Sequence, residues 1–237
     1  MTKELDEKSE WLKIRTKLNQ QYEYDENWEN AIKLYDRRLK RKFFKPIESV
    51  IRERILGGEG FTIVTVQCAL IEMFAAFKEG KIFNPDRTKK LAKYEYSRSQ
   101  QIFTDFLLTA SIFEDNFWQY NSGKKVIKDQ PYNAKDFYKD VRCGLMHEAR
   151  TKGNWIIGAT PLTKSVKTER KFIITEDGKM KIYRTVLHHK LLHYLMDYQK
   201  ELRQDSQESE VLRKNFARKL DHLFDIQRST GYSWWIV

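Results

Sequence analysis

Arg142 and His147 are the residues whose types and spacing best suit chemistry, and they lie in the stretch VRCGLMHEAR at residues 141–150. Histidine exchanges protons near neutral pH, and arginine carries a permanent, forked positive charge that suits a developing oxyanion. Five steps along an α-helix turn the chain by about 500°, so the two side chains would point roughly 140° apart. Gly144, between them, would cost a helix on the order of 1 kcal/mol relative to alanine. The trio therefore needs an explanation other than one shared helix face.

The spacing alone decides nothing, because Arg184 and His189 repeat it in RTVLHH at a junction between a hairpin and a helix. His189 and His193 lie four residues apart and could share a helix face as metal ligands, but no further cysteine or carboxylate cluster accompanies them at telling spacing. The chain contains no glycine-rich phosphate loop, no HExxH and no Gly-x-Ser-x-Gly, which argues against P-loop hydrolysis, zinc proteolysis and serine hydrolysis. We therefore expect no metal and no cofactor.

The composition indicates one folded domain with a preference for polyanions. The 237 residues include 44 Lys and Arg against 33 Asp and Glu, a net charge of +11, which favours nucleic acid as a partner. The start MTKELDEKSE is no signal peptide, and Cys68 and Cys143 form no CxxC pair. The apolar run FTIVTVQCALIEMFAAF is interrupted by Gln67 and Glu72, so it predicts a buried helix rather than a membrane span. A cytoplasmic protein without membrane association follows.

The basic segment RRLKRKFFKPIESVIRER, from Arg37 to Arg54, allows two interpretations. It could track phosphates, or it could be the solvated face of a helix anchored by its apolar residues. The second interpretation is the more usual one for such a segment. A DNA-binding regulator would depend on this segment alone, and no helix-turn-helix pattern supports it.

Apolar spacing predicts most of the remaining elements. Thr62 is expected to cap a helix that ends near Glu79, Asn133 to begin a helix just before Ala134, and the polar NSGKKVIKDQP to form a connection. Asp177-Gly178 predicts a β-hairpin, and the terminal GYSWWIV is expected to pack back on the body. The other expected helices cover residues 8–38, as two helices divided near YEYDEN, then 99–118, 188–204 and 211–227.

Two blocks, residues 41–77 with GEGFTIVTVQCALIEMF and residues 136–155 with FYKDVRCGLMHEARTKGNW, closely resemble the HEPN family of helical-bundle proteins. The resemblance implies a mainly α fold, a HEPN-like helical bundle with a small β-hairpin insertion and additional N- and C-terminal helices. It implies a single domain over residues 1–237. Its parts are N-terminal helices with the basic segment at 1–58, the bundle core with the Arg-x4-His motif at 59–155, the hairpin at 170–184 and C-terminal helices at 187–237.

The resemblance also implies an activity, because many HEPN proteins are homodimeric, metal-independent endoribonucleases that serve as toxins or antiviral effectors. Arg142 would clamp the phosphate and His147 would act as general base or acid in a cleft shared by two chains. Gly144 would let two backbones approach at the dimer interface. Arg150 and Lys152 would hold flanking phosphates, or would be a charged helix end favoured by the dipole. Cys143 departs from the polar residue common in the family after the arginine.

RNA, a second copy of the chain, and an inhibitory antitoxin or regulatory protein are the partners that this resemblance implies. The alternative function is a non-catalytic HEPN module that uses the same helix surface to dimerise or to bind RNA, a nucleotide or a protein. A variant His147→Ala separates the two hypotheses, because only the first predicts a loss of RNA cleavage while the dimer remains.

Overall fold

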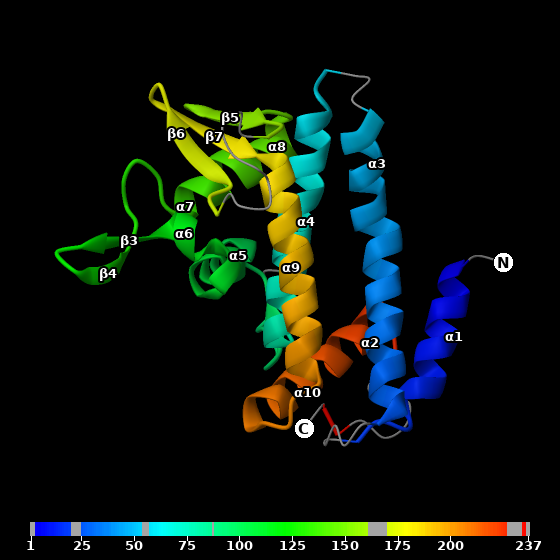
Figure 1. Cartoon of the computed structure of the whole chain (residues 1–237). Helices are drawn as coiled ribbons and strands as arrows, with labels where there is room; N and C mark the ends of the chain where they lie inside the picture. Colours follow the sequence, from blue (N-terminus) through cyan, green and yellow to red (C-terminus); the bar gives the residue numbers. More distant parts are fainter. Residues whose placement is uncertain are drawn as a thin grey trace. The chain divides into compact units, whose positions relative to one another are not determined.

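The chain is mainly helical, as the sequence predicts (Figure 1). The computed structural model describes residues 3–19, 25–53, 57–86, 88–160, 170–226 and 234–235. Contacts group the chain into two compact units. Unit 1 contains residues 1–42, 74–97 and 195–237, and unit 2 contains residues 43–73 and 98–194. The single domain expected over residues 1–237 stays a prediction.

Unit 1 is built around buried aromatic side chains. Its helices are α1 (Lys3–Arg15), α2 (Glu26–Leu39), the part of α4 (Glu59–Glu79) from Phe74 onward, the part of α9 (Arg184–Leu202) from Leu195 onward, and α10 (Gln207–Leu223). It also contains the two-residue parallel strands β1 (Ile82–Phe83) and β2 (Glu95–Tyr96). The two helices expected over residues 8–38 are thus present as α1 and α2. Their buried aromatic partners include Trp28, Tyr35, Phe77 and Phe216.

The buried carboxylate of Asp221 on α10 collects donors from both ends of the chain. Arg15 donates to it twice, at 2.8 and 2.9 Å, and the indole N–H groups of Trp11 and Trp235 each donate at 2.8 Å. Trp234 and Trp235 are buried, which confirms the expected packing of GYSWWIV for these two residues. The rest of that stretch lies outside the described residues.

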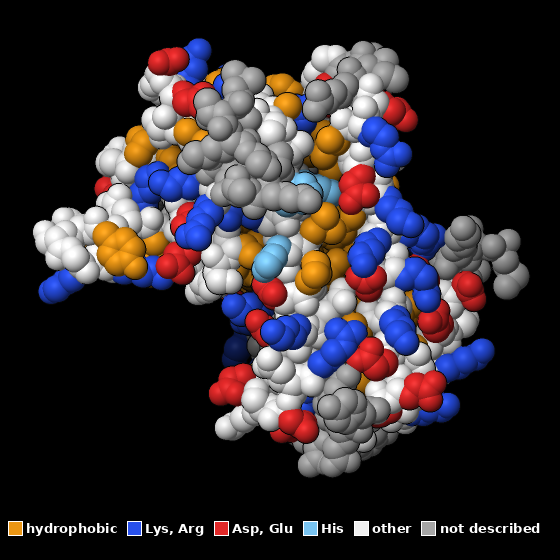
Figure 2. Space-filling view, in the orientation of Figure 1, with side chains coloured by type: hydrophobic (Ala, Val, Ile, Leu, Met, Phe, Trp, Pro, Cys, Tyr) orange, Lys and Arg blue, Asp and Glu red, His pale blue; other side chains and the backbone are white. Residues whose placement is uncertain are grey.

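The cations of the basic segment that fall in unit 1 are largely paired with acidic side chains. Arg38 and Arg41 both contact Glu7, Arg41 at 2.6 Å, and Lys40 contacts Asp36 at 2.9 Å. Over α2, basic and acidic side chains are interleaved on the face shown in Figure 2. This pairing supports the interpretation as a solvated helix face over that of a surface that tracks phosphates. Arg54 lies outside the described residues.

Unit 2 holds the predicted motif and combines short helices with small sheets. In chain order its elements are the end of the π-helix η1 (Lys40–Phe44), α3 (Lys45–Glu53), the first part of α4, α5 (Ser99–Thr109), the 3₁₀-helix η2 (Ser111–Phe113), α6 (Glu114–Phe117), β3 (Trp118–Asn121), β4 (Lys124–Ile127), α7 (Ala134–Asp136), the π-helix η3 (Phe137–Arg142), α8 (Cys143–Glu148), β5 (Trp155–Gly158), β6 (Ile173–Glu176), β7 (Lys179–Tyr183) and the first part of α9.

The hairpin predicted around Asp177-Gly178 is confirmed. Strands β6 and β7 pair antiparallel, with Ile173 opposite Ile182, and both turn residues have positive φ, 49° and 71°. A type I′ turn requires this conformation at both positions. Strand β5 adds to the other side of β7 in parallel, so the sheet order is β5-β7-β6.

Three local expectations were wrong. The helix of residues 99–118 is interrupted at Ala110, where φ −78° and ψ 122° are extended. The segment NSGKKVIKDQP is not simply a connection, because β3 and β4 form a second hairpin whose turn residues Ser122 and Gly123 have φ 49° and 78°. Helix α4 begins at Glu59, so Thr62 lies inside its first turn and does not cap it.

By length and composition, α4 could cross a membrane, but 61% of its apolar window is buried inside the structure. Such burial is typical of the core helix of a soluble protein, which agrees with the expected buried helix.

Candidate functional site around Arg142 and His147

The segment that carries the motif starts at a well-formed helix cap. The Asn133 side chain accepts hydrogen bonds from the backbone N–H groups of Lys135 and Asp136, and the Asp136 carboxylate accepts one from the Asn133 N–H. This reciprocal capping box satisfies donors that a helix start leaves unpaired. The predicted helix start is therefore confirmed.

The helix then widens into the π-helix η3, which ends at Arg142. The backbone N–H of Cys143 donates to the carbonyl of Tyr138, five residues earlier. Phe137 anchors the segment, because its ring packs against Phe103, Trp155 and Phe172 with centroids 5.7–6.2 Å apart. Short π-helical turns occur frequently at functional sites, and this one contains the motif arginine.

Arg142 is held by a carboxylate on another helix. Its Nη2 donates to Glu72 Oε2 on α4 at 3.0 Å, and both side chains are less than one fifth exposed. The guanidinium carbon also lies 5.4 Å from the centroid of the Tyr138 ring. Burial opposes the charge on Arg142, but the Glu72 carboxylate more than offsets it and raises the pKa of Arg142 above its ordinary value. Arg142 is therefore a fixed cation.

Two side chains near Arg142, those of Tyr138 and Cys68, are neutral at physiological pH. Burial raises the pKa of the Tyr138 phenol to about 12, and burial likewise raises the pKa of the Cys68 thiol to about 12. Neither group is suited to give up a proton near pH 7.

His147 is exposed on α8 and makes no hydrogen bond or ion pair with any residue that the structure describes. Helix α8 covers Cys143–Glu148, and Arg142 at its N-cap has φ −60° and ψ −51°, so the angular separation expected for five helical steps is retained. The structure thus brings Arg142 to Glu72 and leaves His147 directed to solvent. The two motif residues do not meet in a joint contact within one chain.

Gly144 is required by the chain's own backbone. A Cβ at this position would lie 2.4 Å from the carbonyl oxygen of Arg150, which folds back after α8 ends at Ala149 in the left-handed conformation with φ 53°. The carbonyl of Gly144 accepts hydrogen bonds from the backbone N–H groups of Ala149 and Arg150. This contact gives the glycine a reason within one chain, and its part in a dimer interface stays a prediction.

Arg150 and Lys152 converge on one carboxylate. Glu148 contacts Arg150 at 3.1 Å and Lys152 at 2.5 Å. The hydrogen bond from Lys152 is the main reason that the pKa of Glu148 lies below its ordinary value, and Arg150 adds to the effect. Both cations are near the motif, and a phosphate would have to compete with Glu148 for them.

Glu72 is the residue of this candidate site that sequence reasoning missed. It lies 70 residues before Arg142, so no local pattern joins the two. One signal was present, because a carboxylate that interrupts an apolar helix needs a cationic partner once it is buried. The spacing of the motif could not reveal which cation that would be.

Within the part of the chain that the structure describes, no further metal ligand joins His189 and His193. Among the described residues, no group of three or more His, Cys, Asp or Glu side chains is arranged to hold a metal ion.

Comparison with models of protein families, with curated proteins and with solved structures finds no match to this chain. The resemblance to the HEPN family therefore stays a prediction based on the residues of the motif.

Proposed function

We propose that this chain is a metal-independent endoribonuclease of the HEPN type that acts in the cytoplasm as a homodimer. One observation carries the proposal: the exposed imidazole of His147, without a protein partner among the described residues, follows by five positions an arginine fixed by Glu72. The solvent-directed base and the fixed cation suit the two roles that RNA cleavage requires.

The roles follow from the chemistry of the two side chains. His147 takes the proton from a ribose 2′-hydroxyl, which attacks the adjacent phosphorus, and His147 of the second copy protonates the leaving 5′-oxygen. Arg142 uses one N–H for Glu72 and has further N–H donors without a partner among the described residues, so these stabilise the charge of the phosphorane. The products are a 2′,3′-cyclic phosphate and a 5′-hydroxyl.

A composite site accounts for the separation of the two side chains. Within one chain they point in different directions, so His147 of one copy would act with Arg142 of a second copy at the dimer cleft. Arg150 and Lys152 would bind flanking phosphates after exchanging Glu148 for RNA. An antitoxin or regulatory protein would limit the activity by covering this cleft.

The second candidate function is a non-catalytic HEPN module that binds RNA, a nucleotide or a protein. The pairing of Arg142 with Glu72 and of Arg150 and Lys152 with Glu148 favours it, because each of these cations already has an acidic partner. In this case the helix surface would serve dimerisation or binding without chemistry.

Cleavage of labelled RNA in the presence of EDTA tests the proposal. Wild-type protein, His147→Ala and Arg142→Ala are incubated with tRNA and mRNA, and His193→Ala, an exposed histidine on α9, serves as the matched control. We expect cyclic phosphate ends from wild type and His193→Ala, and a loss of about 10²–10⁴-fold in rate for His147→Ala. The size of each protein in solution is measured in parallel.

Equal cleavage by His147→Ala and wild type would contradict the assignment of His147. If no protein cleaves RNA while wild type binds RNA as a dimer and Arg142→Ala does not, the non-catalytic module is the better description.

A further inference from the structure

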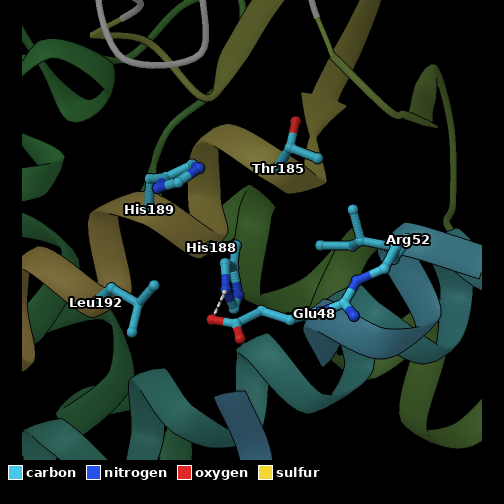
Figure 3. A pocket seen from close by; sticks show the side chains of 7 residues that line it. Glu48, Arg52, Thr185, His188, His189 and Leu192 are labelled. Carbon is cyan, nitrogen blue, oxygen red and sulfur yellow. Dashed lines mark hydrogen bonds and ion pairs between the residues drawn. The ribbon is translucent and has the colours of Figure 1, made fainter. Parts of the chain in front are cut away.

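A cavity of about 620 Å³ lies between α3 and the first part of α9 in unit 2 (Figure 3). Its volume falls within the roughly 300–1,000 Å³ of small-molecule sites. Neither Arg142 nor His147 lines it, so it is distinct from the proposed nuclease site. The lining side chains are Glu48, Ile51, Arg52, Thr185, His188, His189 and Leu192.

Glu48 and His188 form the fixed polar part of this cavity. They point toward each other from α3 and α9, and His188 Nε2 lies 3.3 Å from Glu48 Oε1 (Figure 3). His188 is only 3% exposed, and its Nδ1 is buried without a hydrogen-bond partner among the described residues. Burial lowers the pKa of His188, so the ring is neutral near pH 7 and donates its Nε2–H to the carboxylate. The Glu48 side chain is 43% exposed, which leaves it oriented yet accessible to a ligand.

Arg52 supplies the positive charge. It lies one helical turn after Glu48 on α3, is exposed, and has no hydrogen bond or ion pair in the described part of the chain. Its planar fork of donors matches the oxygens of a phosphate. An arginine that lines a cavity without a protein partner is available to an anionic ligand.

The remaining side chains that line the cavity provide contact area rather than charge. The exposed ring of His189 and the side chains of Ile51 and Leu192 present flat or apolar groups. The Thr185 hydroxyl is already engaged, because it donates to the carbonyl of Ala159 at 2.5 Å. Figure 2 shows histidine side chains beside hydrophobic and acidic side chains over α9.

These lining side chains favour a ligand whose two ends differ in charge. A bare anion would meet Glu48 and a bare cation would meet Arg52, so neither alone satisfies the site. A ligand with a phosphate at one end and neutral hydroxyl donors at the other satisfies both. Carboxylates bind ribose hydroxyls in this way in dinucleotide-binding folds, and imidazole rings stack on bases.

We propose that this cavity binds a ribonucleoside monophosphate, with the phosphate on Arg52, the ribose hydroxyls on Glu48 and the base against His189 and Leu192. Because stacking tolerates every base, the site recognises the ribose and phosphate more than the base. The proposal does not depend on nuclease activity, since the two sites share no residue.

Calorimetric titration of the full chain in EDTA tests this proposal with AMP, 2′-deoxy-AMP, adenosine and inorganic phosphate. We expect saturable binding of AMP, at least about tenfold weaker binding of adenosine and of phosphate, and intermediate binding of 2′-deoxy-AMP. Arg52→Ala should reduce the affinity for AMP to that for adenosine. Glu48→Gln keeps the size of the side chain and should remove the preference for AMP over 2′-deoxy-AMP.

Lys45→Ala, on the exposed face of the same helix, is the matched control and should bind AMP as wild type does. The far-ultraviolet circular dichroism of each variant shows whether it remains folded. The proposal is overturned if AMP, GMP, CMP and UMP all fail to bind saturably at millimolar concentration. It is equally overturned if phosphate binds as tightly as AMP, or if folded Arg52→Ala and Glu48→Gln bind AMP with wild-type affinity.

Discussion

Two arginine–carboxylate pairs in this chain are built in opposite ways. In unit 1, the Asp221 carboxylate accepts two hydrogen bonds from Arg15 and one each from Trp11 and Trp235, and Arg15 is 2% exposed. In unit 2, Arg142 donates a single hydrogen bond to Glu72, and its side chain is 18% exposed.

The difference separates an ion pair that stabilises a fold from one that leaves capacity for a ligand. A buried carboxylate with four donors has no remaining oxygen lone pairs to offer, so its role is to join α1, α10 and Trp235. A half-buried guanidinium with one bond keeps donors for another acceptor. We therefore expect substitutions at the first pair to act on stability and those at the second to act mainly on ligand binding or catalysis.

Asp221→Ala should produce the largest effect on stability. It leaves Arg15 buried without its charge partner and removes acceptors from two indole groups, so the free energy of unfolding should fall by about 3–5 kcal/mol. Urea denaturation followed by tryptophan fluorescence measures this change. Glu210→Ala on the same helix, whose contact with Lys214 is a 3.8 Å surface pair, should change stability by about 0.5 kcal/mol or less. Similar losses for both variants would contradict the comparison.

Gly144→Ala probes the backbone behind the second pair. The new Cβ would meet the Arg150 carbonyl at 2.4 Å, and the backbone must shift because neither atom belongs to a flexible side chain. We expect a loss of about 1–3 kcal/mol in the free energy of unfolding, measured by urea denaturation at several protein concentrations. Gly57→Ala, where the added Cβ has no atom within 4 Å, is the control. A stability change in Gly144→Ala that depends on protein concentration would place the effect in a dimer instead.

Glu72→Gln should reduce stability by only about 1 kcal/mol, because the amide oxygen still accepts a hydrogen bond from Arg142 and both groups are partly solvated. The amide carries no negative charge that would compete with a phosphate for Arg142, so binding of a non-cleavable RNA should become tighter. Thermal unfolding and an RNA titration measure the two effects. A loss near that of Asp221→Ala would show that the second pair is structural like the first.

The sequence predicted what depends on local pattern. Asn133 as a helix cap, Asp177-Gly178 as a hairpin turn and the burial of Trp234 and Trp235 follow from residue type and near neighbours, and the structure confirms them. The second hairpin carried a weaker signal, because the Ser122-Gly123 turn is flanked by polar residues with little apolar alternation.

At the candidate site, the sequence predicted the motif residues Arg142 and His147 but not the carboxylate that contacts Arg142. The partners Glu72 of Arg142 and Glu48 of His188 lie 70 and 140 residues away, and tertiary packing alone brings them together. The π-helix η3 was also unexpected; it begins at Phe137, whose ring packs against Phe172, 35 residues later in the chain. Residue types thus indicated the chemistry, whereas the fold determines which cations remain available for it.

Glu48 and His188 form a third pair, in which the basic side chain can lose its charge. Substitution of His188 should have the smallest effect on stability of the variants considered. Burial holds the pKa of His188 below its ordinary value of 6.5, so the unfolded chain binds this proton more readily than the folded one. Its contribution to stability is therefore present above about pH 6.5 and decreases as the pH falls toward the lower pKa of the folded protein. Urea denaturation at pH 7.5 and pH 5.0 should show a smaller pH dependence in His188→Gln than in wild type. The same pH dependence in both would mean that His188 titrates alike in the folded and unfolded chain, as an imidazole on the surface would.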